Sequence, residues 1–357
     1  MANWIQILSN FIDHYHTVNM ALFCIAFVLQ NSQSYCHPSS FWFCILCIFV
    51  SQRYVGILNV CIIDYNVYNY RNQGLIAPDP GLYDMTGNPI FDFYWGIELY
   101  PQLGEYISLK AMINSRFGLW IWQLIVLICW KAHYELYNSQ YGKGNIIFPM
   151  TTTTLLTTIY LAKFYYWEDG YMQTIDICVD RFGFYIAWGC IAAVPGFFTL
   201  PSLYLVKHSP NMNFIAIINL FIFILGLFSI FANYYTDYQR QLVRQTDGDC
   251  LIWSKKPVLI RAKYKDSNNV ERNSVLLASG SWGMARHLNY LFELLIAFAF
   301  GAPALATSII PYLYFLFIFI LIIHRIMRDD DKCSKKYGRY WQEYCQLVPY
   351  KIVPYIF

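Results

Sequence analysis

Charged residues are scarce in this chain. Only 13% of its 357 residues are Asp, Glu, Lys or Arg, whereas soluble domains usually carry about 25%. Hydrophobic residues make up 57%, more apolar surface than a soluble domain could bury. The net charge is +3, and segment 324–357 accounts for all of it with seven basic and four acidic residues. The composition predicts a membrane protein with lipid as its partner, and it gives no sign of a nucleic-acid binder.

Motifs that hold a nucleotide or a metal through local spacing are also missing. The sequence contains neither GxGxxG nor GxxxxGK[ST], so a bound nucleotide would be held by side chains between helices. Cys44 and Cys47 form a CxxC inside the apolar run FWFCILCIFV, and no second pair accompanies them, so we expect no metal site. The first residues lack a basic n-region, so we expect no cleavable signal peptide.

What the sequence does contain is a series of apolar runs. A helix needs about 20 apolar residues to cross a bilayer. Six runs are strong candidates, and two weaker ones are either short (19–31) or carry charges (282–300). The eight runs lie at residues 19–31, 41–63, 117–136, 144–167, 182–206, 213–235, 282–300 and 304–323. We therefore expect an all-α, polytopic membrane protein with about eight transmembrane helices.

The second half of the chain has a readable topology. The turn KHSPNM joins 182–206 to 213–235, and Gly301 with Pro303 separates 282–300 from 304–323, which predicts two helical hairpins. This parity places Arg240, the polar loop that follows it and the charged tail on one face of the membrane. The Lys and Arg residues there indicate the cytoplasmic face.

A small β-hairpin is expected within the polar loop, because PVLIRAKY and VERNSVLLA flank the turn KDSNN. We divide the chain into two regions. Residues 1–140 form N-terminal transmembrane helices and a polar connection, and residues 141–357 form the C-terminal catalytic region.

Polar side chains recur at helical spacing in LLASGSWGMARHLNYLFEL, residues 276–294. Trp282, Arg286, Asn289, Tyr290 and Glu293 would form one stripe if this segment is a continuous helix. Ionisable groups inside a membrane segment are functional candidates, because their burial in lipid is costly. The alternative is a structural pair, of Arg286 with Glu293 or with another helix.

Two further clusters lie next to apolar runs. Arg325 and Asp329 are one turn apart at the end of 304–323, and Arg240 and Arg244 are one turn apart after 213–235. Arginine pairs suit phosphate oxygens. The alternative for the tail is a basic run attracted to anionic lipid, but that reading gives no use to the aspartate.

These stretches resemble the sterol reductase family, which includes the delta-14 and the 7-dehydrocholesterol reductases. The resemblance covers roughly residues 70–357, and within the family the sequence looks most like the 7-dehydrocholesterol reductases. Five segments carry it: GNPIFDFYWGIELYPQL, TIDICVDRFGFYIAWG, RQTDGDCLIWSKKP, SGSWGMARHLNYLFEL and HRIMRDDDKCSKKYGRYWQEYCQLVPYKIVPYIF. Family members have about ten helices, so this chain is short at its N-terminus.

The resemblance implies NADPH-dependent reduction of the delta-7 double bond of a sterol, in the endoplasmic reticulum membrane with the tail in the cytoplasm. It implies an NADPH pocket between the C-terminal helices and a second pocket that admits the sterol from the bilayer. An isolated alkene accepts hydride only after protonation, so an acid is needed. By resemblance, the catalytic residues are Asp329, Glu293 and Arg325. The cofactor-binding residues are Arg240, Arg244, Trp282, His287, Asn289, Arg325, Lys336 and Tyr344.

The chain departs from the family at several positions. Glu293 stands where the family usually has aspartate. Cys190, Ala193 and Phe198 replace an aspartate, a tryptophan and a tyrosine that is the family's proposed proton donor. A phenyl ring cannot donate a proton, which leaves three readings. Asp329 acts through a water, or another tyrosine substitutes (Tyr204 or Tyr185), or activity is impaired.

Three other functions remain open at this point. One is a delta-14 sterol reductase, and another is a catalytically degenerate sterol or nucleotide binder. The third is a membrane methyltransferase of the isoprenylcysteine type, which the long SGSWGMARHLNY match disfavours.

Overall fold

The computed structural model describes residues 86–103, 107–141, 148–171, 174–210, 215–265 and 271–356. The chain divides into two compact units, one within residues 1–146 and 171–199, the other within 147–170 and 200–357. The helices expected at 19–31 and 41–63 lie outside the described residues, as do Cys44 and Cys47. The functional division at residue 140 stays a prediction.

The described part of the first unit contains helices and one very short strand pair. Its elements are α4 (Pro89–Trp95), β1 (Gln102–Leu103), β2 (Ile107–Ser108), α5 (Leu109–Met112), η2 (Ile113–Phe117), α6 (Gly118–Tyr141), α9 (Ile175–Cys178), α10 (Phe184–Trp188), η3 (Gly189–Ala193) and α11 (Val194–Phe197). Asn88 begins α4 by accepting hydrogen bonds from two backbone amides of its first turn, and proline occupies the next position.

Two π-helical segments, η2 and η3, pack against each other in this unit. The Cys190 thiol of η3 donates to Asn114 Oδ1 of η2 at 3.2 Å. Gly118 lies directly against the Cys190 carbonyl, where no side chain could fit. The position at which the resemblance leads us to expect an aspartate is thus filled by a thiol that bonds an amide.

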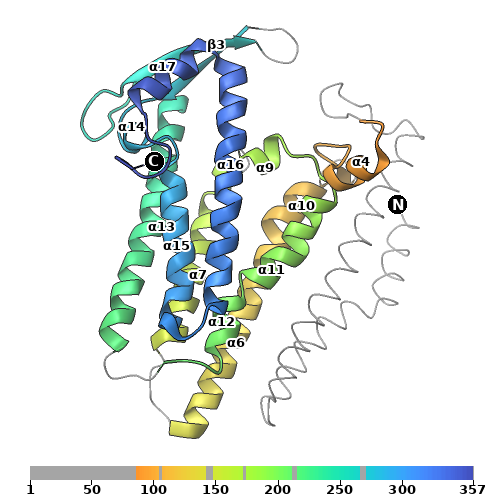
Figure 1. The fold of residues 1–357 in the computed structure, drawn as a ribbon, viewed down its shortest axis with the longest axis vertical. Helices are drawn as coiled ribbons and strands as arrows, with labels where there is room; N and C mark the ends of the chain where they lie inside the picture. Colours follow the sequence, from red (N-terminus) through yellow and green to blue (C-terminus); the bar gives the residue numbers. More distant parts are fainter. Residues whose placement is uncertain are drawn as a thin grey trace. The chain divides into compact units, whose positions relative to one another are not determined.

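The second unit is a helical bundle with a β-hairpin at one end (Figure 1). Its elements are α7 (Phe148–Tyr166), α12 (Leu200–Leu205), α13 (Ile215–Gln245), β3 (Leu259–Lys265), β4 (Glu271–Leu277), α14 (Ser281–Met284), α15 (Leu288–Gly301), η4 (Ala302–Thr307), η5 (Ile310–Tyr312), α16 (Leu313–Tyr337) and α17 (Arg339–Leu347). A short helix, α8 (Glu168–Tyr171), follows α7.

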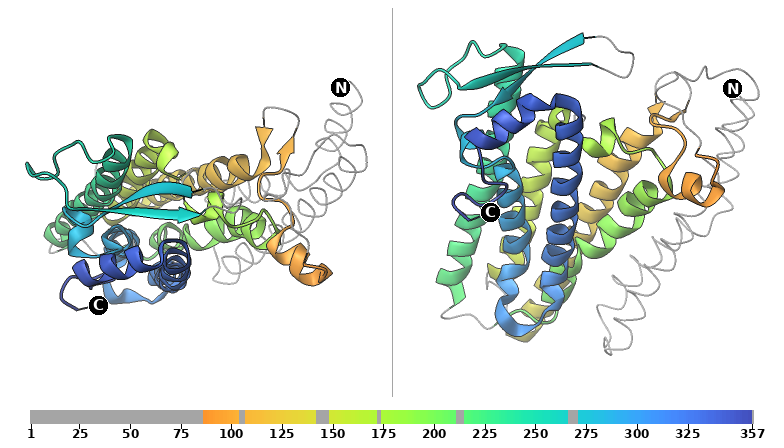
Figure 2. Two further views of the ribbon diagram at one scale, coloured as in Figure 1. Left: turned by 90° about the horizontal axis from the view of Figure 1, so that it is seen from above. Right: turned by 45° about the horizontal axis from the view of Figure 1, so that its top comes forward.

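Helix α15 lies at the centre of this bundle, packed on α13, α16 and α7. The three long helices α13, α15 and α16 run side by side in both Figure 1 and Figure 2. Among the described residues, five helical stretches are long and apolar enough to cross a membrane: 109–137, 184–205, 216–245, 288–307 and 310–337. They correspond to five of the expected runs, and the total of eight stays a prediction. Helix α7 forms at 148–166 but is not one of the five.

The predicted β-hairpin is confirmed. Strands β3 and β4 pair antiparallel, with Ile260 opposite Leu276 and Ala262 opposite Ser274. Their apolar face is buried against α17 and the end of α16, so the hairpin covers the cytoplasmic end expected for this bundle (Figure 2).

The predicted continuous helix over 282–300 is wrong. Helix α14 ends at Met284, Ala285 is extended (φ −155°, ψ 150°), and α15 begins only at Leu288. The backbone amides of Arg286 and His287 donate to the carbonyls of Tyr350 (2.9 Å) and Lys351 (2.7 Å) instead of to the preceding helical turn. Trp282 and Arg286 therefore do not share a helical stripe with Asn289 and Glu293.

The close packing of three helices at Gly226 gives a first testable prediction. A Cβ at Gly226 of α13 would lie 2.7 Å from both methyl carbons of Leu156 in α7 and 3.3 Å from Cβ of Ala299 in α15. We expect Gly226→Leu to destabilise the bundle by about 1–3 kcal/mol, because the helices must separate to admit it. Thermal denaturation in detergent measures the loss. Phe228→Leu, at a side chain that is 58% exposed on the same helix, is the control. Equal melting temperatures for both variants would contradict this packing.

Candidate active site

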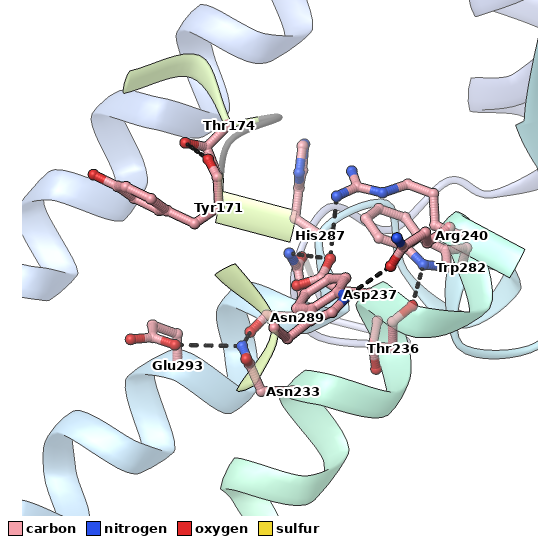
Figure 3. A network of polar contacts seen from close by, with 12 residues as sticks. Tyr171, Thr174, Asn233, Thr236, Asp237, Arg240, Trp282, His287, Asn289 and Glu293 are labelled. Atoms are coloured by element: carbon pink, nitrogen blue, oxygen red, sulfur yellow. Dashed lines mark hydrogen bonds and ion pairs between the residues drawn. The ribbon is translucent and has the colours of Figure 1, made fainter. Parts of the chain in front are cut away.

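The carboxylate of Asp237 joins α13 to α15. Its Oδ1 accepts hydrogen bonds from Arg240 Nη2 at 3.2 Å and from Asn289 Nδ2 at 3.1 Å. The guanidinium of Arg240 in turn lies over the ring of Trp282, 4.5 Å from its centroid. Figure 3 shows these side chains converging from the end of α13, from α14 and from the start of α15. One carboxylate thus orients an amide and a cation that stacks on an indole.

Trp282 is fixed from several sides. Its Nε1 donates to the Thr236 carbonyl at 2.7 Å, and its own carbonyl accepts from the Tyr344 hydroxyl at 3.3 Å. The preceding amide, that of Ser281, donates to Gln239 Oε1 at 2.9 Å. The buried indole therefore presents a fixed face to Arg240, which is the pre-organisation that a ligand-binding cation–π pair needs.

His287 links this cluster to the charged end of α16. Its ring stacks on Tyr290 with centroids 5.3 Å apart and planes nearly parallel. Its Nδ1 lies 3.9 Å from Asp329 Oδ2, while the adjacent Asp330 pairs with Lys351 at 2.8 Å. Tyr290 also has Arg325 among its charged neighbours. Asp329 and Arg325 thus belong to the same neighbourhood as His287 and Tyr290.

Glu293 belongs to a second network, one helical turn deeper in the bundle. Its two oxygens accept from the Tyr160 hydroxyl (2.6 Å) and from Asn233 Nδ2 (3.3 Å). Asn233 Nδ2 also donates to the Asn289 carbonyl at 2.9 Å, and its Oδ1 accepts from Lys163 Nζ at 2.5 Å. These bonds tie α7, α13 and α15 together, and no Arg286–Glu293 pair is found among the described contacts. The thiol of Cys345 instead accepts from Arg286.

Most of the predicted site residues come together in the second unit. Direct contacts or close electrostatic neighbours join them: Arg240, Arg244, Trp282, His287, Asn289, Arg325, Asp329 and Tyr344. Lys336 differs, because its ammonium group lies over the ring of Tyr264 on β3, 4.1 Å from the centroid. That contact fastens the β-hairpin to α16.

Sequence reasoning missed Asp237, Asn233, Tyr160 and Lys163. A signal existed for Asp237, since it is the first charge after the uncharged stretch of α13 and lies one turn before Arg240. Tyr160 and Lys163 carried a weaker signal, as polar groups in an otherwise apolar helix. Their partners are 60 or more residues away in the sequence, so spacing alone could not pair them.

The cluster has unused hydrogen-bonding capacity that suits a bound polar ligand. Among the described buried atoms, His287 Nε2 and Asn289 Oδ1 have no hydrogen-bond partner. A buried polar atom without a partner costs about 1–3 kcal/mol, so a ligand that satisfies it gains affinity. Arg240, whose side chain is 39% exposed, and the neighbouring Arg244 add guanidinium groups suited to phosphate. These residues fit a phosphorylated nucleotide.

The sequence matches the ergosterol biosynthesis ERG4/ERG24 family over residues 14–357. The chain belongs to this family of sterol reductases. It is 40% identical to the 7-dehydrocholesterol reductase of Arabidopsis thaliana over 285 residues, which cover 80% of this chain and 64% of that protein. The corresponding protein of Xenopus laevis is 37% identical over 272 residues, 76% of this chain and 56% of that protein.

A delta(14)-sterol reductase of Methylotuvimicrobium alcaliphilum is also similar, at 33% identity over 272 residues, 76% of this chain and 60% of that protein. The chain therefore matches between 56% and 64% of the length of these three relatives. The expected family is confirmed, and this member of it is a multi-pass membrane protein, because its described part alone has five helices long and apolar enough to span.

His287 predicts how stability depends on pH. It precedes the membrane-spanning stretch 288–307, and burial lowers its pKa below the ordinary 6.5, although Asp329 and Asp330 oppose the shift. The unfolded chain then binds the proton more readily than the folded protein. The free energy of unfolding is therefore unaffected by His287 above about pH 6.5 and decreases as the pH falls below that value. The total decrease is about 1.4 kcal/mol for each unit by which the pKa of His287 is lower in the folded protein than in the unfolded chain.

We expect the melting temperature of the wild-type protein to fall between about pH 7.5 and about pH 5.5. His287→Gln, which cannot titrate, should show a smaller fall. Identical pH profiles for the two proteins would show that His287 is not the titrating group.

Proposed function

We propose that this protein reduces the delta-7 double bond of a sterol with NADPH, in the endoplasmic reticulum membrane, with the β-hairpin and charged tail in the cytoplasm. The observation that carries the proposal is the joined cluster of Asp237, Arg240, Trp282 and Asn289, with His287 and Asp329 beside it. The 7-dehydrocholesterol reductases of A. thaliana and X. laevis are more similar (40% and 37%) than the delta-14 enzyme above (33%), which favours delta-7.

The first task of the site is to hold the cofactor. Arg240 and Arg244 would bind phosphate oxygens, and the fixed Trp282 ring keeps Arg240 extended over its face. His287 Nε2 and Asn289 Oδ1, which have no hydrogen-bond partner in the protein, would form hydrogen bonds with polar groups of the cofactor. Tyr344 acts through Trp282, whose carbonyl it bonds. When bound, NADPH supplies hydride to the ring carbon.

The second task is to supply a proton to the alkene. Asp329 is the acid we assign, because it lies beside His287 and close to Tyr290 and can be re-protonated through that pair. Arg325, on the same helix one turn away, would balance the negative charge of Asp329 once its proton has been transferred. The sterol itself would enter from the bilayer, which agrees with a reductase built from membrane helices.

Glu293 is better described as a positioning residue. Both its oxygens are engaged, by Tyr160 and by Asn233, and the Asn233 amide also holds the backbone of Asn289. Glutamate is one methylene longer than the aspartate that the resemblance leads us to expect here, and Tyr160 and Asn233 hydrogen-bond its carboxylate at that greater reach. Glu293 therefore acts on catalysis through the placement of α15.

To test the proposal, the protein is expressed in a yeast strain that lacks its endogenous late sterol reductases. Membranes receive 7-dehydrocholesterol with and without NADPH, and gas chromatography with mass spectrometry identifies the product. We expect cholesterol only with NADPH, and loss of at least about a hundredfold in rate for Asp329→Asn and Arg325→Ala.

If the protein reduces a delta-14 sterol but not 7-dehydrocholesterol, the proposed substrate bond would change to the delta-14 double bond. No product from either sterol, with the protein folded, would indicate a degenerate binder instead. Unchanged rates in both variants would overturn the site assignment.

Phe198 provides a separate test of the proton source. Its ring packs edge-on against buried Trp122, with centroids 5.0 Å apart, so it serves as a packing residue. If Asp329 supplies the proton, Phe198→Tyr should leave the rate within about twofold of wild type. A large gain would show that the missing phenol limits the reaction. Phe198→Leu, which also lacks a hydroxyl, controls for altered packing against Trp122.

A further inference from the structure

The segment between α13 and β3 has an exposed apolar tip. Leu251, Trp253 and Val258 are 62%, 53% and 53% exposed. Lys255 and Lys256, also exposed, lie between them. Of the two nearby acids, Asp247 is paired with Arg261 at 2.7 Å, which leaves Asp249 against two lysines. The tip is thus apolar with a positive charge at its edge.

The backbone of this tip is held in a tight turn at an energetic cost. Ile252 and Lys255 exchange two hydrogen bonds, of 2.9 and 3.1 Å. The two residues between them, Trp253 and Ser254, both have left-handed backbones, with φ of 51° and 64°. Neither is glycine, so each costs about 1–2 kcal/mol. The turn points a large indole outward where a glycine would be easier to accommodate.

The tip is also fastened firmly to the site. Ile252, between exposed Leu251 and Trp253, is buried in a cluster with Val243, Leu277 and Trp282. Gly280 allows this approach, because a Cβ there would collide with Ile252 and with Gln239. The exposed side chains are therefore presented by a fixed loop.

The depth of the tip follows from its contacts with α13. That helix carries no charge from Ile215 to Thr236, about the 20 residues that cross the hydrocarbon core. The chain reverses direction after Gln245, where the Gly248 amide donates a hydrogen bond to the Val243 carbonyl at 2.9 Å. Ile252 then packs beside Val243 and Trp282, and Trp282 bonds Thr236. Ile252, with Leu251 and Trp253 on either side of it, thus lies at the level of residues 236–243, within about 10 Å of the hydrocarbon edge, which is the headgroup layer.

We infer that residues 251–258 form an interfacial anchor that inserts Leu251, Trp253 and Val258 among phospholipid headgroups of the bilayer that the chain spans. Tryptophan prefers this layer because its ring is apolar and its N–H is polar. Lys255 and Lys256 favour anionic lipid, each by about fivefold in surface affinity. Figure 1 shows the segment looping out beside the end of α13, away from α15 and α16.

The test uses the full chain in lipid nanodiscs, with the photo-crosslinking residue p-benzoylphenylalanine placed at 253 or, in a second variant, at 251. Position 272 on β4, an exposed site on the hairpin, is the matched control. Each variant is first checked for a single peak in size-exclusion chromatography. After illumination, mass spectrometry should find phospholipid adducts at 253 and 251 and none at 272.

A second comparison tests the lysines. In nanodiscs with phosphatidylserine and phosphatidylcholine, Lys255→Gln/Lys256→Gln should lower the phosphatidylserine share of the adducts. An unchanged share would overturn the role of the lysines. Adducts only to a second copy of the chain, or no lipid adduct at either 253 or 251, would overturn the anchor. These readouts do not depend on sterol reduction.

Discussion

The amide of Asn233 joins three helices at the level of the membrane. Lipid offers no hydrogen bonds, so a polar side chain there must find its partners within the protein. Asn233 uses both ends of its amide, accepting from Lys163 of α7 and donating to the Asn289 carbonyl and to Glu293 of α15. Loss of any one helix from this arrangement would leave buried groups without partners. The position of α15 against α13, on which the candidate site depends, is thereby fixed.

The site is built outward from that joint. Asn289, held through its backbone by Asn233, turns its side chain to Asp237, and Asp237 orients Arg240 over Trp282. The order of these contacts follows α13 from its uncharged part toward the membrane surface. Polarity therefore rises along one helix face, from an amide through a carboxylate to a guanidinium. A ligand with phosphates at the surface and an apolar reaction partner in the bilayer fits such a gradient.

Sequence reasoning predicted what local patterns determine. The β-hairpin followed from two apolar strands around KDSNN, and the spans from runs too long and too apolar for solvent. The break at Ala285 could not be predicted in this way, because it depends on pairing with the backbone of Tyr350 and Lys351, more than 60 residues later. The same limit applies to Asn233, whose bonding partners lie on other helices. The family resemblance named residues that the structure brings into one neighbourhood, but it did not give their contacts.

The break after α14 also explains why Trp282 and Asn289 can serve one site. In a continuous helix, Trp282 and Asn289 would lie two turns apart on the same helix face, and both side chains would point toward the same neighbouring helix. The extended Ala285 lets α14 turn back toward α13, where Trp282 reaches the Thr236 carbonyl while Asn289 reaches Asp237. Both partners lie on adjacent residues of α13. The backbone carbonyls of Tyr350 and Lys351, by pairing with the amides of Arg286 and His287, therefore shape the site although neither residue contributes a side chain to its centre.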